Sequence, residues 1–255
     1  MKGFPWGKLT PKAADNGTCT ATPYKRRGTV KTVPSEKKRI IIAMEIITLN
    51  TLLITGNNMA SAAEIIKAGG LVAVPTETVY GLAADGLNAA AVEKIYDVKN
   101  RPETNRISLL VSGMADVEKF CRDIPDAARG LAEKFWPGPL TMILFKKDVV
   151  PDIVTAGTDT VGVRCPDHPK TLELIRLAGV PLAAPSANMS GEPSPKNVTD
   201  VLTVFNGKID AAIDGGQCVV GIESTIVDLT VRPPKILRQG GLSRIAIEEA
   251  LNITL

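Results

Sequence analysis

The stretch from Leu71 to Leu82, Leu-Val-Ala-Val-Pro-Thr-Glu-Thr-Val-Tyr-Gly-Leu, constrains the fold more than any other part of the sequence. Its first four residues are apolar, which is long enough for a strand buried on both faces. Pro75 then ends the strand, because proline has no N–H group to donate to a neighbouring strand. Polar side chains follow at once, and a buried strand that delivers them at its carboxyl end is typical of ligand sites in open α/β sheets. Taken alone, the stretch also fits a plain strand followed by a capped turn.

The rest of the chain alternates between strand-like and helix-like segments, a pattern typical of α/β domains. Helical spacing and capping residues predict helices at 59–68, 88–98, 114–121, 125–135, 169–178, 197–205 and 243–251. Apolar runs predict strands at 45–48, 71–74, 107–111, 140–146, 160–164, 181–184, 210–213 and 235–238, and a loop-to-strand junction at 221–228. With 255 residues the chain can bury a sizeable core, in one large domain or two small ones.

Composition narrows the class of protein. Apolar residues make up 44% and charged residues 22%, as in soluble globular proteins, and no apolar run approaches the ~20 residues of a membrane span. The single histidine, His168, argues against histidine metal sites and Ser-His-Asp triads. No C-x-x-C pair supports a zinc or redox motif, and reduced thiols in the cytoplasm are the default for four cysteines far apart in the sequence: Cys19, Cys121, Cys165 and Cys218.

Charge is unevenly distributed along the chain. Residues 1–43 hold ten Lys/Arg and two acidic residues, a net +8, whereas the remainder holds twenty and twenty-five, a net −5. We expect the first 43 residues to be a basic, disordered extension, serving as a transit peptide, a nucleic-acid arm or a leader, and the working domain to span 44–255. Because that domain is mildly acidic overall, cations gathered inside it need a reason, such as an anionic ligand.

Polar or cationic side chains recur where the predicted strands end. They are Thr76 with Tyr80, Thr141, Arg164, Ser186 with Asn188, Ser224 with Thr225, and Arg238, and a loop adds Lys99 and Arg101. Any one of them fits a solvated loop residue or a turn-forming hydroxyl. Together they supply hydroxyls and cations without a nucleophile–base pair, which suits phosphate and carboxylate binding and displacement at phosphorus. Neither a P-loop nor a G-x-G-x-x-G motif after a strand is present.

Six motifs in order give the chain a specific resemblance to a known family. They are Pro75-Thr-Glu-Thr-Val-Tyr-Gly-Leu82, Lys99-x-Arg101-Pro102, Trp136-Pro-Gly-Pro-Leu-Thr141, Val163-Arg164, Pro185-Ser-Ala-Asn188 and Glu223-Ser-Thr225. From about Ala62 to Leu251 the chain resembles the YrdC-like family, the threonylcarbamoyl-AMP synthases, in its short, single-domain form. The resemblance implies a twisted, open, mixed α/β sheet flanked by helices, with a central cationic cavity.

The resemblance also implies an activity and the residues that carry it. ATP, L-threonine and bicarbonate (or CO2) would give L-threonylcarbamoyl-AMP and pyrophosphate, and a partner transferase would then form N6-threonylcarbamoyladenosine at position 37 of tRNAs that read ANN codons. Threonine would be held by Thr76, Arg164, Ser186 and Ser224. ATP would be held by Lys99, Arg101, Asn105, Thr141, Asn188, Ser194 and Arg238, with Lys99 and Arg101 as the catalytic cations. Glu77 and Tyr80 would shape the cavity, Mg²⁺ would accompany ATP without a protein cage, and tRNA would be contacted only indirectly or weakly.

Three positions depart from the family's usual residues, and two other functions stay open. Arg106 stands where relatives often have proline, Leu110 where we align a histidine, and Lys196 where a threonine is frequent. An RNA-binding or ribosome-assembly module could use the same cationic surface and the basic extension, although aromatic residues for base stacking make up only 4% of the chain. A carbamoyl transferase domain, as in hydrogenase maturation, normally accompanies cysteine-rich zinc segments, which the sequence lacks.

Overall fold

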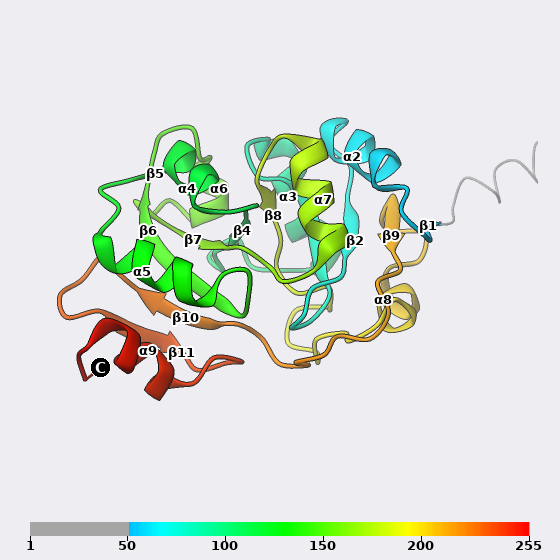
Figure 1. The fold of residues 1–255 in the computed structure, drawn as a ribbon. Helices are drawn as coiled ribbons and strands as arrows, with labels where there is room; N and C mark the ends of the chain where they lie inside the picture. The colour runs from blue at the N-terminus through cyan, green and yellow to red at the C-terminus, as the bar shows by residue number, and fades with distance from the viewer. Residues whose placement is uncertain (1–50, 255) are drawn as a thin grey trace, which may run out of the picture. The chain divides into compact units, whose positions relative to one another are not determined.

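The computed structural model of the chain describes residues 51–254. The predicted extension at 1–43 and the predicted strand at 45–48 lie outside the described residues, so both stay predictions. The described residues form one mixed sheet with helices on both of its faces (Figure 1).

Eleven strands pair into this sheet in the described part of the chain. Their order is β1 (Leu52–Ile54), β9 (Ala211–Ile213), β2 (Val72–Val74), β3 (Gly81–Asp85), β8 (Leu182–Ala183), β4 (Leu109–Leu110), β7 (Thr160–Arg164), β6 (Leu140–Lys146), β10 (Thr225–Asp228) and β11 (Lys235–Arg238), with β5 (Cys121–Arg122) paired to β6. The pairs β1–β9, β9–β2, β4–β7 and β6–β10 are parallel and the others antiparallel. The predicted open, mixed sheet is therefore confirmed.

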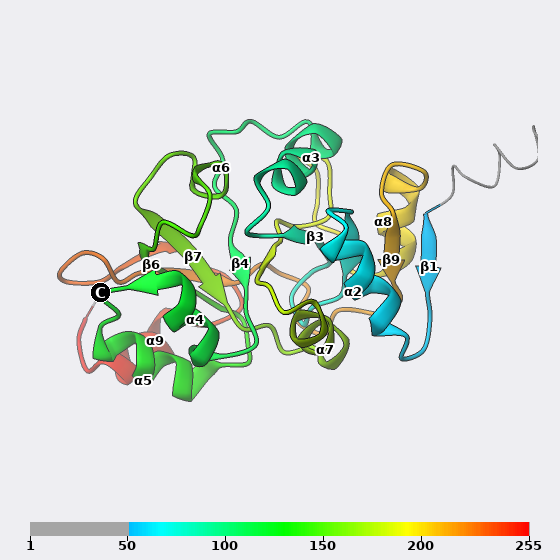
Figure 2. The same ribbon diagram turned by 90° about the horizontal axis from the view of Figure 1, so that it is seen from above.

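The helices cover the two faces of the sheet (Figure 2). Helices α3 (Ala89–Lys99) and α6 (Asp152–Thr155) lie on one side, and α2 (Met59–Lys67), α4 (Met114–Phe120), α5 (Asp126–Phe135) and α7 (Pro169–Ala178) on the other. Helix α8 (Val198–Phe205) contacts β9, and α9 (Arg244–Leu251) contacts α5. Asn88 and Ser243 cap α3 and α9 through their side chains, as predicted. Within residues 51–254, every helix is too short or too polar to cross a membrane.

Strand β2 is buried on both faces, as its apolar run predicts. Val74 belongs to a core cluster with Ile66 of α2, and Ala73 belongs to a second cluster with Ile95 of α3. Successive side chains of a strand point to opposite faces, so neighbouring residues of β2 enter different clusters. The segment 75–80 that follows β2 therefore starts from the middle of the core.

Several short elements differ from the prediction. Strands β1, β3 and β5 and helix α6 were not predicted, and β4 and β8 are shorter than the predicted strands at 107–111 and 181–184. The residues of β3, Gly-Leu-Ala-Ala-Asp, have low intrinsic strand preference. They form a strand because β2 and β8 pair with them from both sides and because the first four are buried.

Thr225, at the start of β10, fastens the loop that follows β11. Its hydroxyl, which is fully buried, donates to Leu242 O (2.6 Å) and accepts from Gly240 N (2.9 Å) and Leu242 N (3.1 Å). The backbone of Gly240 lies so close to β10 that an added Cβ would be 2.2 Å from Glu223 O. This hydroxyl therefore helps to hold the chain immediately after Arg238 against β10, together with the hydrogen bond from Gly241 N to Glu223 O (2.9 Å).

We predict that Thr225→Val lowers the free energy of unfolding by about 2 kcal/mol, because it leaves buried backbone groups without their partner. Urea denaturation measures the change. Thr203→Val is the matched control, since Thr203 is exposed on α8 and its hydroxyl donates only to Thr199 O. The control should change stability by less than about 0.5 kcal/mol, and equal losses in the two variants would contradict the role of Thr225.

Candidate active site

A cavity of about 180 Å³ opens where all six sequence motifs meet, since each motif supplies at least one lining residue. Four arginines line it, and we call it the arginine cavity: Arg101, Arg106, Arg164 and Arg238. Glu223 is the one carboxylate among its lining residues in the described part of the chain. Eight of the residues predicted from the sequence line this cavity: Thr76, Tyr80, Arg101, Thr141, Arg164, Ser186, Ser224 and Arg238.

A second cavity, of about 450 Å³, is lined by the segment 187–204 and includes the predicted residues Asn188 and Ser194. We call it the loop cavity. Two hydrogen bonds join its wall to that of the arginine cavity: Ser186 Oγ donates to Asn188 Oδ1 (2.5 Å), and Ser194 Oγ donates to Glu223 Oε1 (2.6 Å). Three predicted residues line neither cavity: Glu77, Lys99 and Asn105.

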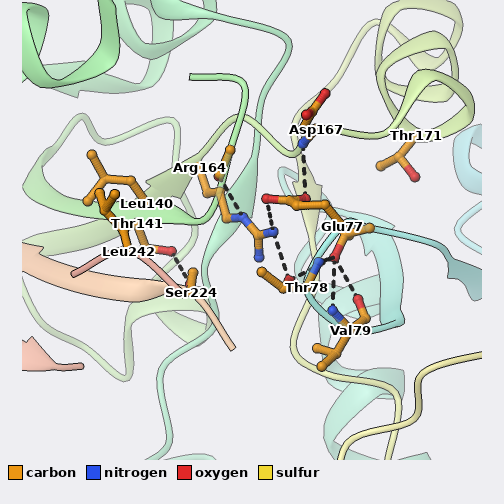
Figure 3. Close-up of polar contacts among 12 residues, drawn as sticks. Glu77, Thr78, Val79, Leu140, Thr141, Arg164, Asp167, Thr171, Ser224 and Leu242 are labelled. Carbon is orange, nitrogen blue, oxygen red and sulfur yellow. Dashed lines mark hydrogen bonds and ion pairs between the residues drawn. The ribbon is translucent and has the colours of Figure 1, made fainter. Parts of the chain in front are cut away.

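Arg164 lies between two groups of polar side chains at the end of β7 (Figure 3). Its Nη2 is 2.8 Å from Glu77 Oε1 and donates to Thr78 Oγ1 (2.8 Å), and its Nε donates to Gly138 O (3.3 Å). Both charged side chains are buried. Among the described residues none accepts a hydrogen bond from Nη1, so this nitrogen is available to an anion in the cavity.

Glu77 supports Arg164 from behind instead of facing the cavity. Its Oε2 accepts from Asp167 N (3.0 Å), whereas Oε1 is held only by the charge of Arg164, without an aligned hydrogen bond from the described residues. The predicted role of Glu77 as a cavity wall therefore becomes an indirect one, in which it fixes the guanidinium of Arg164.

Thr76 organises the turn after β2. Its hydroxyl donates to Val79 O (2.6 Å), accepts from Thr78 N (3.2 Å) and lies 2.9 Å from Thr78 Oγ1. Thr78, which was not predicted as a site residue, thus links Thr76 to Arg164. The polar run Thr-Glu-Thr signalled the turn, but not which hydroxyl reaches the arginine.

Tyr80 joins three loops around the arginine cavity. Its hydroxyl donates to Gly216 O (3.0 Å) and accepts from Gly215 N (3.0 Å), while its backbone O accepts from Ala187 N (2.7 Å). Burial raises the pKa of Tyr80 to about 12, so the phenol stays neutral. Tyr80 lines the arginine cavity, and its predicted role in shaping that cavity stays a prediction.

Hydrogen bonds among polar side chains also connect β6, β10 and β11. Thr141 Oγ1 lies 2.7 Å from Ser224 Oγ, and Arg238 donates through Nη2 (2.9 Å) and Nε (3.1 Å) to Ser224 O. Desolvation lowers the pKa of Arg238, although its outer side is exposed. The hydrogen bond from Ser194 lowers the pKa of the Glu223 carboxyl, which therefore stays ionised beside these cations. Glu223 belongs to a motif that the sequence singled out, but its own role was not predicted.

Lys99 is almost fully enclosed, with 1% of its surface exposed. Its Nζ donates to Ser186 O (2.5 Å) and to Asn188 O, and its backbone O accepts from Ser190 N (3.2 Å). Burial, and secondarily the charge of Arg101, lowers the pKa of Lys99 to about 8. Lys99 therefore holds the loop that carries Ser186 and Asn188, and its predicted contact with phosphate stays a prediction.

Arg101 enters the arginine cavity from the loop after α3. Its Nε donates to Asn105 O (3.1 Å) and its Nη2 donates to Arg106 O (2.9 Å). Asn105 thus contributes its backbone carbonyl to this loop. Arg106 and Leu110, two of the residues that depart from the family pattern, both line the cavity, whereas Lys196 lines neither cavity.

The arrangement of the lining residues favours anion binding. Hydroxyls and arginines surround the arginine cavity, and His168 is not among its lining residues. Within residues 51–254, His, Cys, Asp and Glu side chains nowhere form a group of three suited to a metal ion. A carboxylate and a phosphate are the ligands that such a set of donors recognises.

We predict that Glu77→Gln lowers the free energy of unfolding by about 3 kcal/mol, because Arg164 would keep its buried charge without a compensating partner. Glu118→Gln is the matched control, since Glu118 pairs with Arg129 (2.5 Å) on an exposed surface and should change stability by less than about 1 kcal/mol. Chemical denaturation compares the two variants. Similar losses would show that burial adds nothing to the Glu77–Arg164 pair.

We predict that the stability difference between wild type and Lys99→Met depends on pH. The folded protein releases the Lys99 proton near pH 8, below the ordinary lysine pKa of 10.5. Between these values the unfolded chain binds more protons, so the wild type gains stability relative to the variant as the pH rises, by about 3 kcal/mol in total. Urea unfolding near the two ends of this range measures it. A difference that does not change with pH would refute the lowered pKa.

Comparison with known proteins places this geometry in a family. The family model Sua5_yciO_yrdC, described as "Telomere recombination", matches residues 64–240. The chain is 48% identical over 190 residues to the threonylcarbamoyl-AMP synthase of Pyrococcus abyssi, covering 74% of this chain and 56% of that protein. A putative threonylcarbamoyl-AMP synthase of Mycobacterium tuberculosis is 35% identical over 195 residues, with 76% of this chain and 89% of that protein covered.

Solved structures agree with the sequence comparison. The crystal structure of P. abyssi Sua5 complexed with L-threonine matches with a TM-score of 0.78 and 44% identity, covering 80% of this chain and 61% of that one. Escherichia coli YciO matches with a TM-score of 0.67 at 23% identity, covering 74% of this chain and 95% of that one, which shows the shared fold. This chain spans little more than half the length of the P. abyssi protein. The family model and the relatives together show that the chain is a member of the Sua5/YciO/YrdC family.

Proposed function

We propose that this chain is an L-threonylcarbamoyl-AMP synthase, which combines ATP, L-threonine and bicarbonate or CO2 and releases pyrophosphate. The observation that carries the proposal is Arg164, a buried cation with a free Nη1 in a cavity lined by hydroxyls. Relatives named threonylcarbamoyl-AMP synthase, and the P. abyssi Sua5 complexed with L-threonine, support it. No contact among the described residues specifically favours the RNA-binding alternative.

In this proposal threonine binds at the inner end of the arginine cavity. Arg164 takes the carboxylate, because a guanidinium and a carboxylate form strong, directional hydrogen bonds. Ser186 and Ser224 add hydroxyls from the segments next to β8 and β10. The hydroxyl of Thr76 already donates to Val79 O, so toward the substrate it acts as an acceptor.

ATP takes the rest of the arginine cavity and the loop cavity. At about 180 Å³, the arginine cavity suits the amino acid and the reacting phosphate, and the larger loop cavity suits the nucleoside. Arg101 and Lys99 are the proposed catalytic cations for the phosphates; Lys99 would have to release a loop carbonyl to reach them. The remaining proposed ATP contacts are Asn105, Thr141, Asn188, Ser194 and Arg238.

The proposed chemistry is a nucleotidyl transfer. The amine of threonine adds to CO2 and forms a carbamate, whose oxygen attacks the α-phosphorus of ATP while pyrophosphate leaves. The chain contributes by orienting the reactants and by stabilising the negative charge that develops, which is the main role of a protein in displacement at phosphorus. No protein nucleophile is needed.

Other parts of the proposal follow from the same chemistry. Glu223 is the one carboxylate that lines the cavity in the described part of the chain. Mg²⁺ would enter bound to ATP and water. A partner transferase would use the adenylate to modify adenosine 37 of tRNA, and the chain itself would contact tRNA weakly at most. The reaction would take place in the cytoplasm.

We predict that the purified chain releases pyrophosphate only when ATP, threonine and bicarbonate are all present, and that labelled bicarbonate enters an adenylate product. Arg164→Lys should raise KM for threonine about tenfold or more, because an ammonium cannot replace the two-pronged contact with a carboxylate. KM for ATP should change much less. Steady-state pyrophosphate release measures all three quantities.

Arg129→Ala provides the matched control, because Arg129 is an exposed arginine paired with Glu118 on the surface. Its kinetic constants should equal those of wild type. ATP turnover that ignores threonine would refute the proposed function, and an unchanged KM for threonine in Arg164→Lys would refute the role of Arg164.

A further inference from the structure

Arg106 differs from the other three arginines of the arginine cavity in how few partners it has. Arg164 is paired with Glu77, Arg238 donates to Ser224, and Arg101 donates to two loop carbonyls. The side chain of Arg106 makes one hydrogen bond in the described structure, from Nη1 to Thr160 Oγ1 at 3.3 Å. A guanidinium has five N–H donors, so most of those of Arg106 are unused.

The backbone of Arg106 is nevertheless fixed at the cavity. Its carbonyl accepts from Arg101 Nη2 (2.9 Å), and the next residue, Ile107, donates its N–H to Val154 O (2.9 Å). The side chain is exposed and also lines the cavity, so it stands at the opening. A charged side chain on a fixed backbone, open to solvent and weakly bonded, can turn toward an anion at little cost.

Strand register separates the backbone of Arg106 from that of Arg164. Leu110 of β4 pairs in parallel with Arg164 of β7, and Arg106 precedes Leu110 by four residues. Thr160, the partner of Arg106, likewise precedes Arg164 by four residues on β7. At a rise of about 3.3 Å per residue, the backbones of Thr160 and Arg164 lie about 13 Å apart along β7.

Gly162 lies between Thr160 and Arg164 and shares a face of β7 with both of them. An added Cβ at Gly162 would lie 2.7 Å from Ser108 Oγ and 3.3 Å from Thr141 Cγ2, two residues that line the cavity. Ser108 and Thr141 therefore pack over this glycine and form the cavity wall along this stretch of β7.

We propose that Arg106 binds the β- and γ-phosphates of ATP and the pyrophosphate that they become, an assignment that rests on the proposed function. The carbamate oxygen forms a bond to the α-phosphorus, and the bond from that phosphorus to the α,β-bridging oxygen breaks, leaving its electron pair on pyrophosphate. Attacking and leaving oxygens lie roughly in line. With threonine held at Arg164, pyrophosphate must leave toward the opening, where Arg106 stands.

Calorimetric titration of the full chain with pyrophosphate tests this assignment without any turnover. Arg106→Ala should bind pyrophosphate about tenfold more weakly than wild type, the loss expected for a charge-assisted hydrogen bond at a solvated site. Arg106→Lys should retain part of the affinity, and Arg129→Ala should match wild type. In turnover, Arg106→Ala should raise KM for ATP and the inhibition constant of pyrophosphate, with KM for threonine unchanged.

The two readouts separate failure of this assignment from failure of the proposed function. Equal pyrophosphate affinity in wild type and Arg106→Ala overturns the role of Arg106, even in a fully active enzyme. A wild type that binds no pyrophosphate also overturns it. A wild type that binds pyrophosphate through Arg106 but makes no threonine-dependent product overturns the synthase function and leaves Arg106 as an anion-binding residue.

Discussion

The buried pair of Glu77 and Arg164 is the interaction on which the rest of the site depends. Removing two charges from water is costly, and the attraction between them offsets that cost only when further hydrogen bonds satisfy both groups. Here Asp167 N bonds the carboxylate, and Thr78 and Gly138 O bond the guanidinium. The pair joins the turn after β2 to the end of β7, so the position of the cation is set by the backbone of two strands.

The hydroxyls around the cavity, like Arg164, are held in place by hydrogen bonds to other protein groups. Thr76, Thr141, Ser186 and Ser224 are each already within hydrogen-bonding distance of another protein group. Their orientations are therefore set before any ligand arrives, which reduces the entropy lost on binding. Arg106 differs from these residues, because its side chain makes a single long hydrogen bond in the described structure.

Much of the fold could be predicted from the sequence, because strong periodicity and capping residues define most helices and strands. The capped helix α3 and the buried strand β2 are examples. Strand β3 could not be predicted, since its glycine and alanines are placed by partners distant in sequence. In the site, the segments next to strands and the loop after α3 brought eight predicted residues to one cavity. Lys99 was harder, because its carbonyl partners at Ser186 and Asn188 lie on another loop and draw the long side chain away from the cavity.

The wide spread of the cavity's walls along the sequence has a consequence for synthesis on the ribosome. The turn at Thr76 emerges early, but Ser224 and Arg238 close the opposite wall more than a hundred residues later, through the parallel pairing of β10 with β6. Contacts between such distant segments form late, because the entropy cost of closing a long loop comes before the favourable energy of the contacts. A nascent chain that stops short of β11 can contain both β2 and β7, and hence the Glu77–Arg164 pair, yet have no enclosed cavity. Ligand binding would thus report synthesis through β11, not merely the onset of folding.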